Sequence, residues 1–271
     1  MLLVDKKDGI ARVTLNRPEV RNAFDDALIK QLHESFLSLG KDDSVKAIVL
    51  AGNGPAFCAG ADLNWMKRMA GYGYKENLAD ARALADMLAT LDRLPKPTIA
   101  RVHGPAFAGG TGLVAACDIA VGTPEAKFCF SEAKLGLSPA TISPHVLRAI
   151  GERAARRYFL TAEVFDAHEA QRIGLLSLVV EKDSLDKSVD DLLAHLLAGG
   201  PEALAKIKDL VRTVSNQELD DALVAETAKR IAEIRVSPEG KEGIASFLEK
   251  RKPDWVKQFE AVRVKPPRRK K

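Results

Sequence analysis

Two glycine-containing stretches of the sequence could bring main-chain amides to one ligand. "GPAFCAGADLNWM" (residues 54–66) follows the apolar run "AIVLAG", and "AFAGGTG" (residues 106–112) follows "TIARV". Each places small residues where a strand gives way to a helix start, and free N–H groups and the helix dipole there favour negative charge. The glycines could instead serve close packing alone. The pairing of two such turns favours an oxyanion site that a ligand carbonyl can approach closely.

The same glycines partly match a dinucleotide-binding motif. Gly110 and Gly112, with Ala115, satisfy the pattern G-x-G-x-x-A, and Glu132 lies about twenty residues further on, where a ribose-binding acid belongs. The context does not fit, because seven residues separate "IARV" from Gly110. Only about two turns of helix fit before "DIAV", which is short for a crossover helix. Dinucleotide binding is therefore disfavoured.

Other catalytic patterns are missing. The sequence has no G-x-S-x-G and no H-E-x-x-H motif, and its three cysteines are scattered without zinc spacing. Cys58 has no histidine partner in its motif and is expected to be a small buried thiol. His145 stays a candidate because it follows the segment that contains Glu132. The other histidines are expected at the surface or in packing: His33, His103, His168 and His195.

Composition indicates an ordinary globular protein in a reducing compartment. Of the 271 residues, 46% are apolar and 29% are charged, which argues against disorder. Much of the net charge of +4 lies in "VRVKPPRRKK", without the aromatic-studded basic surface of a nucleic-acid binder. We expect no signal peptide, no membrane span, no disulfide and no nucleic-acid partner, hence a cytoplasmic location.

Strand-like and helix-like segments alternate over the first two thirds of the chain. Apolar residues recur at helical spacing from Asn22 to Leu39 and from Leu78 to Leu91. Asp166 with Glu169 predicts a helix start, and Gly174 its end. After Gly199 the pattern is helical only. Strands are predicted at "IARVTL", "KAIVLAG", "TIARV", "DIAV", "FCF" and "LSLVV", and the late helices at Pro201–Ser215, Glu218–Arg235 and Pro238–Lys250, the last capped by Ser237.

The ordered motifs resemble the crotonase family, that is, enoyl-CoA hydratases and isomerases, over about residues 3–257. The resemblance rests on "VTLNRPEVRNAF", "FCAGADLNWM", "PKPTIARVHGPAFAGGTGLVAACDIAVG", "AKFCFSEAKLGL" and "FLEKRKPDW". It implies an α/β fold, a spiral of ββα units, with a C-terminal helical region used in trimerisation. The expected organisation is a core at 1–199, oligomerising helices at 200–257 and a disordered basic tail at 258–271. Trimers of this family commonly pair into hexamers.

The resemblance also assigns roles to individual residues. Ala61 and Gly109 would donate the two N–H groups that bind the thioester oxygen of an acyl-CoA. Glu132, in "FCFSEAK", matches one of two catalytic glutamates, expected on a strand. Neither a metal nor a separate cofactor is implied, because CoA is part of the substrate. Further substrate-binding positions are Ala59, Asp62, Leu63, Asn64, Arg21, Ala23, Gly112 and Lys250.

The sequence departs from the family at the first of the two catalytic glutamates. Well-known hydratases carry a glutamate three residues past the oxyanion glycine, where this chain has Gly112. Hydration needs a group that activates water and a group that protonates the α-carbon. One carboxyl would have to do both, and burial of Glu132 would raise its pKa toward the useful range.

Three functions remain open: a hydratase, a double-bond isomerase that needs one base, and a CoA-binding protein without this activity. The stretch "GGTGLVAACDIA" and its continuation resemble the methylglutaconyl-CoA and isohexenylglutaconyl-CoA hydratase group, which acts in leucine or acyclic-terpenoid breakdown. This favours a hydratase with a branched or carboxylated substrate. Lys67, Arg68 and Arg148 are candidate partners for the second carboxylate.

Overall fold

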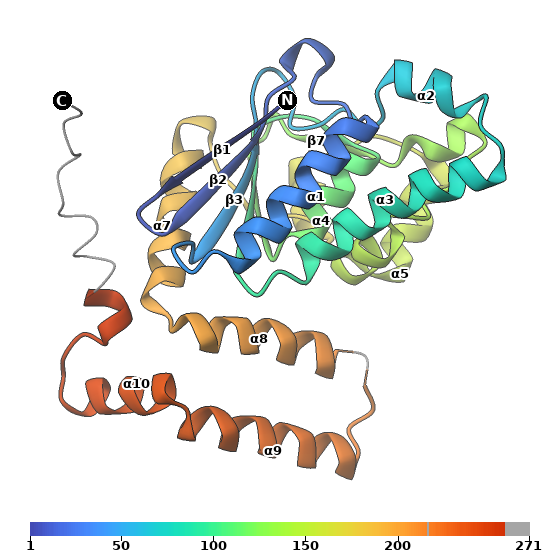
Figure 1. Cartoon of the computed structure of the whole chain (residues 1–271). Coiled ribbons are helices and arrows are strands. Elements are labelled where there is room, and N and C mark those ends of the chain that lie inside the picture. Colours follow the sequence, from blue (N-terminus) through green and yellow to red (C-terminus); the bar gives the residue numbers. More distant parts are fainter. Residues whose placement is uncertain (216, 258–271) are drawn as a thin grey trace, which may run out of the picture.

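A computed structural model describes residues 1–215 and 217–257, and its centre is a six-stranded sheet (Figure 1). The strand order is β1-β2-β3-β4-β6-β9; β1 pairs with β2 antiparallel, and every other neighbouring pair is parallel. A second sheet of three short strands has the order β5-β7-β8. The strands are β1 Leu2–Lys7, β2 Ile10–Leu15, β3 Ala47–Gly52, β4 Thr98–Val102, β5 Ala106–Phe107, β6 Ile119–Gly122, β7 Lys127–Cys129, β8 Phe165–Asp166 and β9 Leu178–Val179.

Helices cover both faces of the large sheet. Ile48 and Leu50 of β3 belong to the main core, with residues of α1 (Asp26–Lys41), α3 (Tyr74–Asp92) and α4 (Gly109–Ala116). Ala47 and Val49 point the other way, into a smaller core with α7 (Leu185–Ala198). Every residue of β3 is buried, so the predicted strand covered on both sides is confirmed. The sequence reasoning did not predict α7.

Capping side chains explain several of the helix starts. Helix α1 starts at Asp26, later than the apolar spacing indicated, because the Asp25 side chain accepts the Leu28 N–H. Asp166 caps α6 (Ala167–Arg172) by accepting the Glu169 N–H, as predicted. Helix α2 (Leu63–Met69) begins within the stretch 54–66, where a helix start was predicted, whereas α5 (Ser143–Thr161) was not predicted.

One predicted strand is shorter than expected, and Glu132 therefore lies outside it. The segment "FCF" contributes only Phe128 and Cys129 to β7. Glu132 lies instead in a 3-10 turn, η2 (Ser131–Leu135), so its assignment to a strand was wrong. Gly136, in the left-handed region with φ +71°, follows η2 and lets the chain reverse after Glu132.

The C-terminal helices form an arm that lies beside the core and not on its sheet (Figure 1). The arm comprises α8 (Pro201–Val214), α9 (Asp221–Val236) and α10 (Pro238–Leu248), with Ser237 capping α10 as predicted. The Lys208 ammonium group joins α8 to the core through the Asp118 carboxylate (2.7 Å). None of the described helices is long and apolar enough to cross a membrane. The predicted basic tail, 258–271, lies outside the described residues.

Candidate active site

The two glycine-containing turns meet, as the sequence predicted. Cys58 and Ala106 pair as a parallel bridge, and the Phe107 N–H donates a 2.9 Å hydrogen bond to the Cys58 carbonyl. A Cβ atom added at Gly60, whose φ is +93°, would lie 3.1 Å from the Phe107 carbonyl oxygen. Only a residue without a side chain fits this contact comfortably.

Each turn offers an unused amide. Within the described part of the chain, the N–H groups of Ala61 and Gly109 have no hydrogen-bond acceptor. Gly109 begins α4, so its N–H has no partner within the helix and is at the positive end of the helix dipole. Ala108 precedes it in a strained conformation (φ 47°, ψ −118°), of the kind that costs about 1–3 kcal/mol and gathers at functional sites. These two amides can bind an oxyanion.

A buried asparagine holds the first turn in place. Asn22 has no exposed surface, and its side-chain N–H groups donate to the carbonyls of Asn53 (2.8 Å) and Ala56 (2.9 Å). Its Oδ1 accepts the Arg17 N–H at 2.8 Å. Sequence reasoning gave neither Asn22 nor Arg17 a role. The available signal was the polar segment "NRPEVRN", which contains both Arg17 and Asn22 and lies between a predicted strand and a predicted helix.

Arg17 joins the caps of two helices. Its guanidinium group forms ion pairs with Asp25 (2.8 Å) and Asp62 (3.2 Å), which cap α1 and α2. Burial opposes the charge of Asp62, but hydrogen bonds from the amides of Asn64 and Trp65, with the charge of Arg17, lower the pKa of this carboxyl. Asp62, predicted to bind substrate, therefore uses its side chain to fix the turn that carries Ala61.

Glu132 has a carboxyl group that is free to react. Its Oε2 atom is buried and has no hydrogen-bond partner in the described structure. Burial raises the pKa of Glu132, although a hydrogen bond from its own N–H acts in the opposite direction. A buried carboxyl without a cation partner is easily protonated, as a group that both takes and gives protons must be.

The small sheet brings Glu132 toward the oxyanion turn. Phe107 of β5 pairs with Cys129 of β7 in parallel register, so the chain leaves both strands at the same edge. Gly109 follows Phe107 by two residues, and Glu132 follows Cys129 by three. The parallel register therefore directs the Gly109 amide and the segment of Glu132 to the same edge of the small sheet, which makes this edge the candidate site.

A family model described as enoyl-CoA hydratase/isomerase matches residues 5–258. The chain belongs to this family. A 2,3-dehydroadipyl-CoA hydratase from Escherichia coli is 32% identical over 94% of this chain and 98% of the relative. Among solved structures, an enoyl-CoA hydratase from Shewanella pealeana is 42% identical, with a TM-score of 0.92 and coverage of 94% of this chain and 95% of that one. Pseudomonas aeruginosa AtuE is 36% identical, with a TM-score of 0.90 and coverage of 94% and 99%.

Most of the outer positions suggested by the family resemblance lie around Ala61. The Ala59 N–H donates to the Arg21 carbonyl at 3.0 Å, which joins the loop of Arg21 and Ala23 to this turn. Leu63, at the start of α2, is 73% exposed and available to a ligand. Asn64 follows it in the same helix. Lys250 follows α10 at the end of the arm, far from α2 within one chain (Figure 1).

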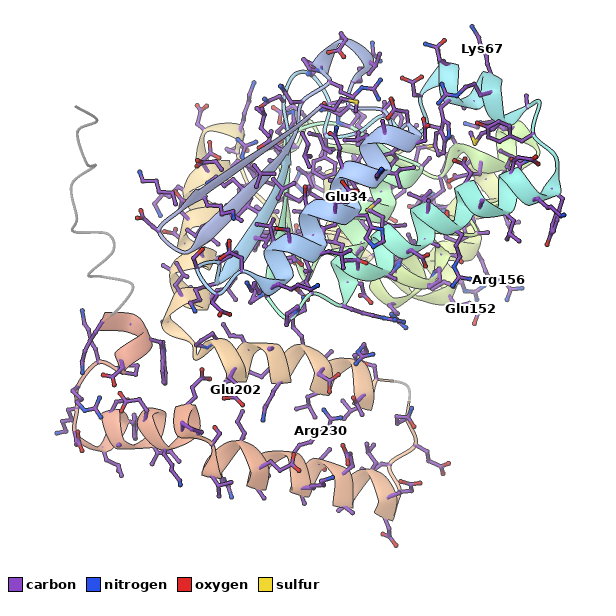
Figure 2. All side chains as sticks on the ribbon, viewed as in Figure 1. Glu34, Lys67, Glu152, Arg156, Glu202 and Arg230 are labelled. Carbon is purple, nitrogen blue, oxygen red and sulfur yellow. The ribbon has the colours of Figure 1, made fainter. Side chains whose placement is uncertain are left out.

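The cations proposed for a substrate carboxylate do not gather at one place. Lys67 projects from α2 away from the core (Figure 2). Arg68 forms an ion pair with Asp26 (2.5 Å). Arg148, on α5, forms an ion pair with Asp92 (3.5 Å). The structure thus gives no support to a shared carboxylate pocket built from these three side chains.

Two other candidate residues, Cys58 and His145, lie in environments that suit a structural role. Burial raises the pKa of the Cys58 thiol to about 12, so the prediction of a small buried thiol is confirmed. His145 is 7% exposed, and its Nδ1 lies 3.9 Å from the Asp92 carboxylate at the C-terminal end of α3. This contact joins α5 to α3 and assigns His145 to packing.

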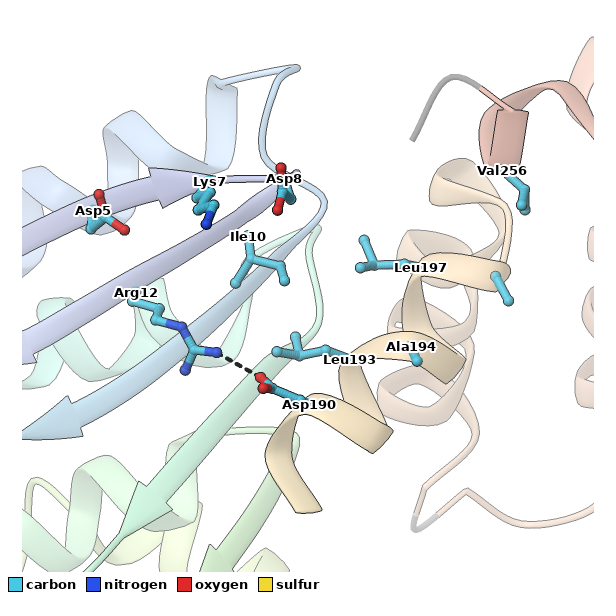
Figure 3. A pocket seen from close by; sticks show the side chains of 11 residues that line it. Asp5, Lys7, Asp8, Ile10, Arg12, Asp190, Leu193, Ala194, Leu197 and Val256 are labelled. Atoms are coloured by element: carbon cyan, nitrogen blue, oxygen red, sulfur yellow. Dashed lines mark hydrogen bonds and ion pairs between the residues drawn. The ribbon is translucent and has the colours of Figure 1, made fainter. Parts of the chain in front are cut away.

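A cavity of about 430 Å³ lies elsewhere, between the β1–β2 hairpin and α7 (Figure 3). An ion pair between Arg12 and Asp190 (2.7 Å) lies at its wall. Ile10, Leu193 and Leu197 supply apolar surface. No predicted site residue lines this cavity, so it is separate from the site at Ala61, Gly109 and Glu132.

Proposed function

We propose that this enzyme adds water to a 2-enoyl-CoA thioester with Glu132 as the acid/base. The observation that carries the proposal is the buried Glu132 Oε2 atom, which has no hydrogen-bond partner in the described structure, at the end of the strand pair that also leads to the free Gly109 amide. The family and the hydratases among its relatives support the reaction class.

In the proposed reaction, the Glu132 carboxylate takes a proton from water while the water oxygen bonds to the β-carbon. The electron pair of the double bond moves toward the thioester oxygen, and the N–H groups of Ala61 and Gly109 stabilise the resulting enolate. The protonated Glu132 then delivers a proton to the α-carbon, and the carboxylate is restored. One oxygen and two hydrogens are added in total.

The raised pKa of Glu132 suits this double role, because a carboxyl closer to neutrality is a better base and still a usable acid. Gly112 supplies no second carboxyl. We propose that a carboxylate on the substrate, or an ordered water, assists Glu132 where the missing acid would act. Equal rates with crotonyl-CoA and with a glutaconyl-type thioester would argue against help from the substrate.

The proposed substrate carries a branch or a second carboxylate, as 3-methylglutaconyl-CoA does. The Escherichia coli relative supports this class, since its name denotes a thioester of a dicarboxylic acid. The family resemblance of the segment around Gly112 supports it as well.

Double-bond isomerisation is a second candidate, favoured by one observation. Proton transfer between two carbons needs a single base, and the site offers Glu132 with no acid at Gly112. The two reactions differ in whether oxygen from water enters the product.

We further propose that the arm mediates assembly into a trimer or hexamer. Large apolar side chains on all three of its helices are exposed in the single chain: Ile207, Val211, Val224, Ile231, Ile244, Phe247 and Leu248. Exposed apolar surface of this kind is typical of subunit interfaces. The cytoplasmic location expected from composition stays a prediction.

The test is product analysis in ¹⁸O-labelled water with three thioesters: crotonyl-CoA, 3-methylglutaconyl-CoA and a 3-enoyl-CoA. The proposal expects one labelled oxygen in the products of the 2-enoyl substrates. Bond migration without label would establish the isomerase instead. No turnover of any of the three would show that the fold is correctly assigned and the proposed substrate is not.

A further inference from the structure

The space beside Gly112 is already filled. A Cβ atom added at Gly112 would lie 2.4 Å from Cγ2 and 2.9 Å from Cβ of Ile142. Real Cβ atoms essentially never make contacts under 3.0 Å. The next atom, Cδ1 of Leu88, would be 3.7 Å away, which is an ordinary contact. The obstruction at this position is therefore Ile142 alone.

Ile142 cannot easily move aside. Its side chain is 1% exposed, and its carbonyl accepts the N–H groups of His145 and Val146, each at 3.1 Å, at the start of α5. Leu88, with no exposed surface, packs in the same core. Closely packed protein interiors accommodate an added methyl group only with strain.

The blocked space borders the reacting groups. Gly109 and Gly112 are three residues apart in α4, so they share a helix face. Side chains tilt toward the N-terminus of their helix, and a side chain at position 112 would lean toward the free Gly109 N–H. Ile142 occupies the place of the first atom of such a side chain.

We propose that Ile142 is a specificity-determining residue: by filling the space beside Gly112, it limits the site to one carboxyl group, Glu132. The proposal rests on the function proposed above. It names the side chain that leaves the active site with a single carboxyl group. It makes Gly112 and Ile142 a coupled pair.

The packing half of the proposal is tested without substrate. In an open helix interior, Gly112→Ala would stabilise the protein, since alanine has the higher helix propensity. The clash predicts the opposite sign: a fall in melting temperature of about 5 °C or more. Ile142→Ala should relieve this change in part, because its Cβ remains, and Ile142→Gly should relieve it fully.

Leu88→Ala is the matched control for this cycle. It removes a comparable volume from the same core but not the clashing atoms, so its effect and that of Gly112→Ala should add. If Gly112→Ala gives no folded protein, recovery of folded protein in the double variants supports the proposal. Failure of both Ile142 variants to improve Gly112→Ala, in yield or in melting temperature, contradicts it.

The functional half compares Gly112→Glu/Ile142→Gly with Gly112→Gln/Ile142→Gly, which differ only in the carboxyl group. The glutamate variant should hydrate a 2-enoyl-CoA about ten-fold faster, with a second ionisation in the pH profile of kcat/KM. Equal rates and equal profiles would overturn the role of Ile142 in selectivity. If the wild-type enzyme hydrates no thioester, the proposed function fails. The melting temperatures of the Gly112 and Ile142 variants still test whether the two positions are in steric contact.

Discussion

The Ala108 N–H donates a 2.8 Å hydrogen bond to the Cys129 carbonyl. This contact ties the strained residue before the Gly109 amide to the strand that leads into Glu132. Gly109, the proposed oxyanion donor, and Glu132, the proposed acid/base, therefore both follow strands of the short β5–β7 pair.

The pH dependence of the reaction should reflect the burial of Glu132. The carboxylate form starts the proposed reaction, and burial raises the pKa of this group. Activity should therefore fall, as pH is lowered, through a pH above the ordinary glutamate value of 4.5. The measurement is kcat/KM against pH. An acid limb at or below 4.5 would contradict the assignment.

Glu132→Gln should make the folded protein more stable at high pH. Because the folded state raises the pKa of Glu132, it holds a proton that the unfolded chain has already lost, and stability falls as pH rises from 4.5 through the folded pKa. The glutamine variant avoids this loss.

Melting temperatures at about pH 4 and pH 8 test this sign. The two proteins should be similar near pH 4, and the variant should melt higher at pH 8. Glu152→Gln, at a 77% exposed side chain, is the control and should change little. A variant that is less stable than the wild type at pH 8 would show that Glu132 has a stabilising partner.

Asn22→Ala should weaken the fold around the first turn. It leaves the buried carbonyl of Ala56 and the part-buried contact to the Asn53 carbonyl without their donor, and the Arg17 N–H without its acceptor. We expect a loss of about 2–4 kcal/mol in the free energy of unfolding, measured with denaturant. Asn16→Ala, which removes an exposed side-chain hydrogen bond to Asn53, should cost less than about 0.5 kcal/mol. Equal effects would remove the special role of Asn22.

Phe247→Glu should disrupt self-association. Phe247 is 82% exposed in the single chain, and a charge at this point of α10 would be buried in an assembly of the kind proposed. Light scattering should give the mass of a trimer or hexamer for the wild type and a smaller mass for the variant. Lys30→Glu, on α1, is the control for added negative charge. A wild type that is monomeric at micromolar concentration would refute the proposed role of the arm.

Much of the site could be predicted because its parts are backbone features of short, ordered motifs. The turns containing Ala61 and Gly109 are recognisable from glycine and alanine placed after apolar strands. Glu132 was found by its motif, although its 3-10 turn was not, since two aromatic residues before it also suit a strand.

The remaining features depend on contacts between distant segments. Ile142 is thirty residues from Gly112 along the chain, and no local pattern indicates that its methyl group fills the space there. Asp62 looked like a ligand contact, but its cap and its ion pair with Arg17 appear only in three dimensions. Lys250 has a suitable charge, yet it lies at the end of an arm that leads away from the site.

The most direct test compares hydration by the wild type and by Glu132→Gln, with Glu152→Gln as the surface control. We predict a loss of about 100- to 10,000-fold in kcat for Glu132→Gln, with KM changed little, because the group moves protons and binds substrate weakly. The control should keep the wild-type rate. A Glu132→Gln enzyme within about ten-fold of the wild type would contradict the central claim that this carboxyl is the acid/base.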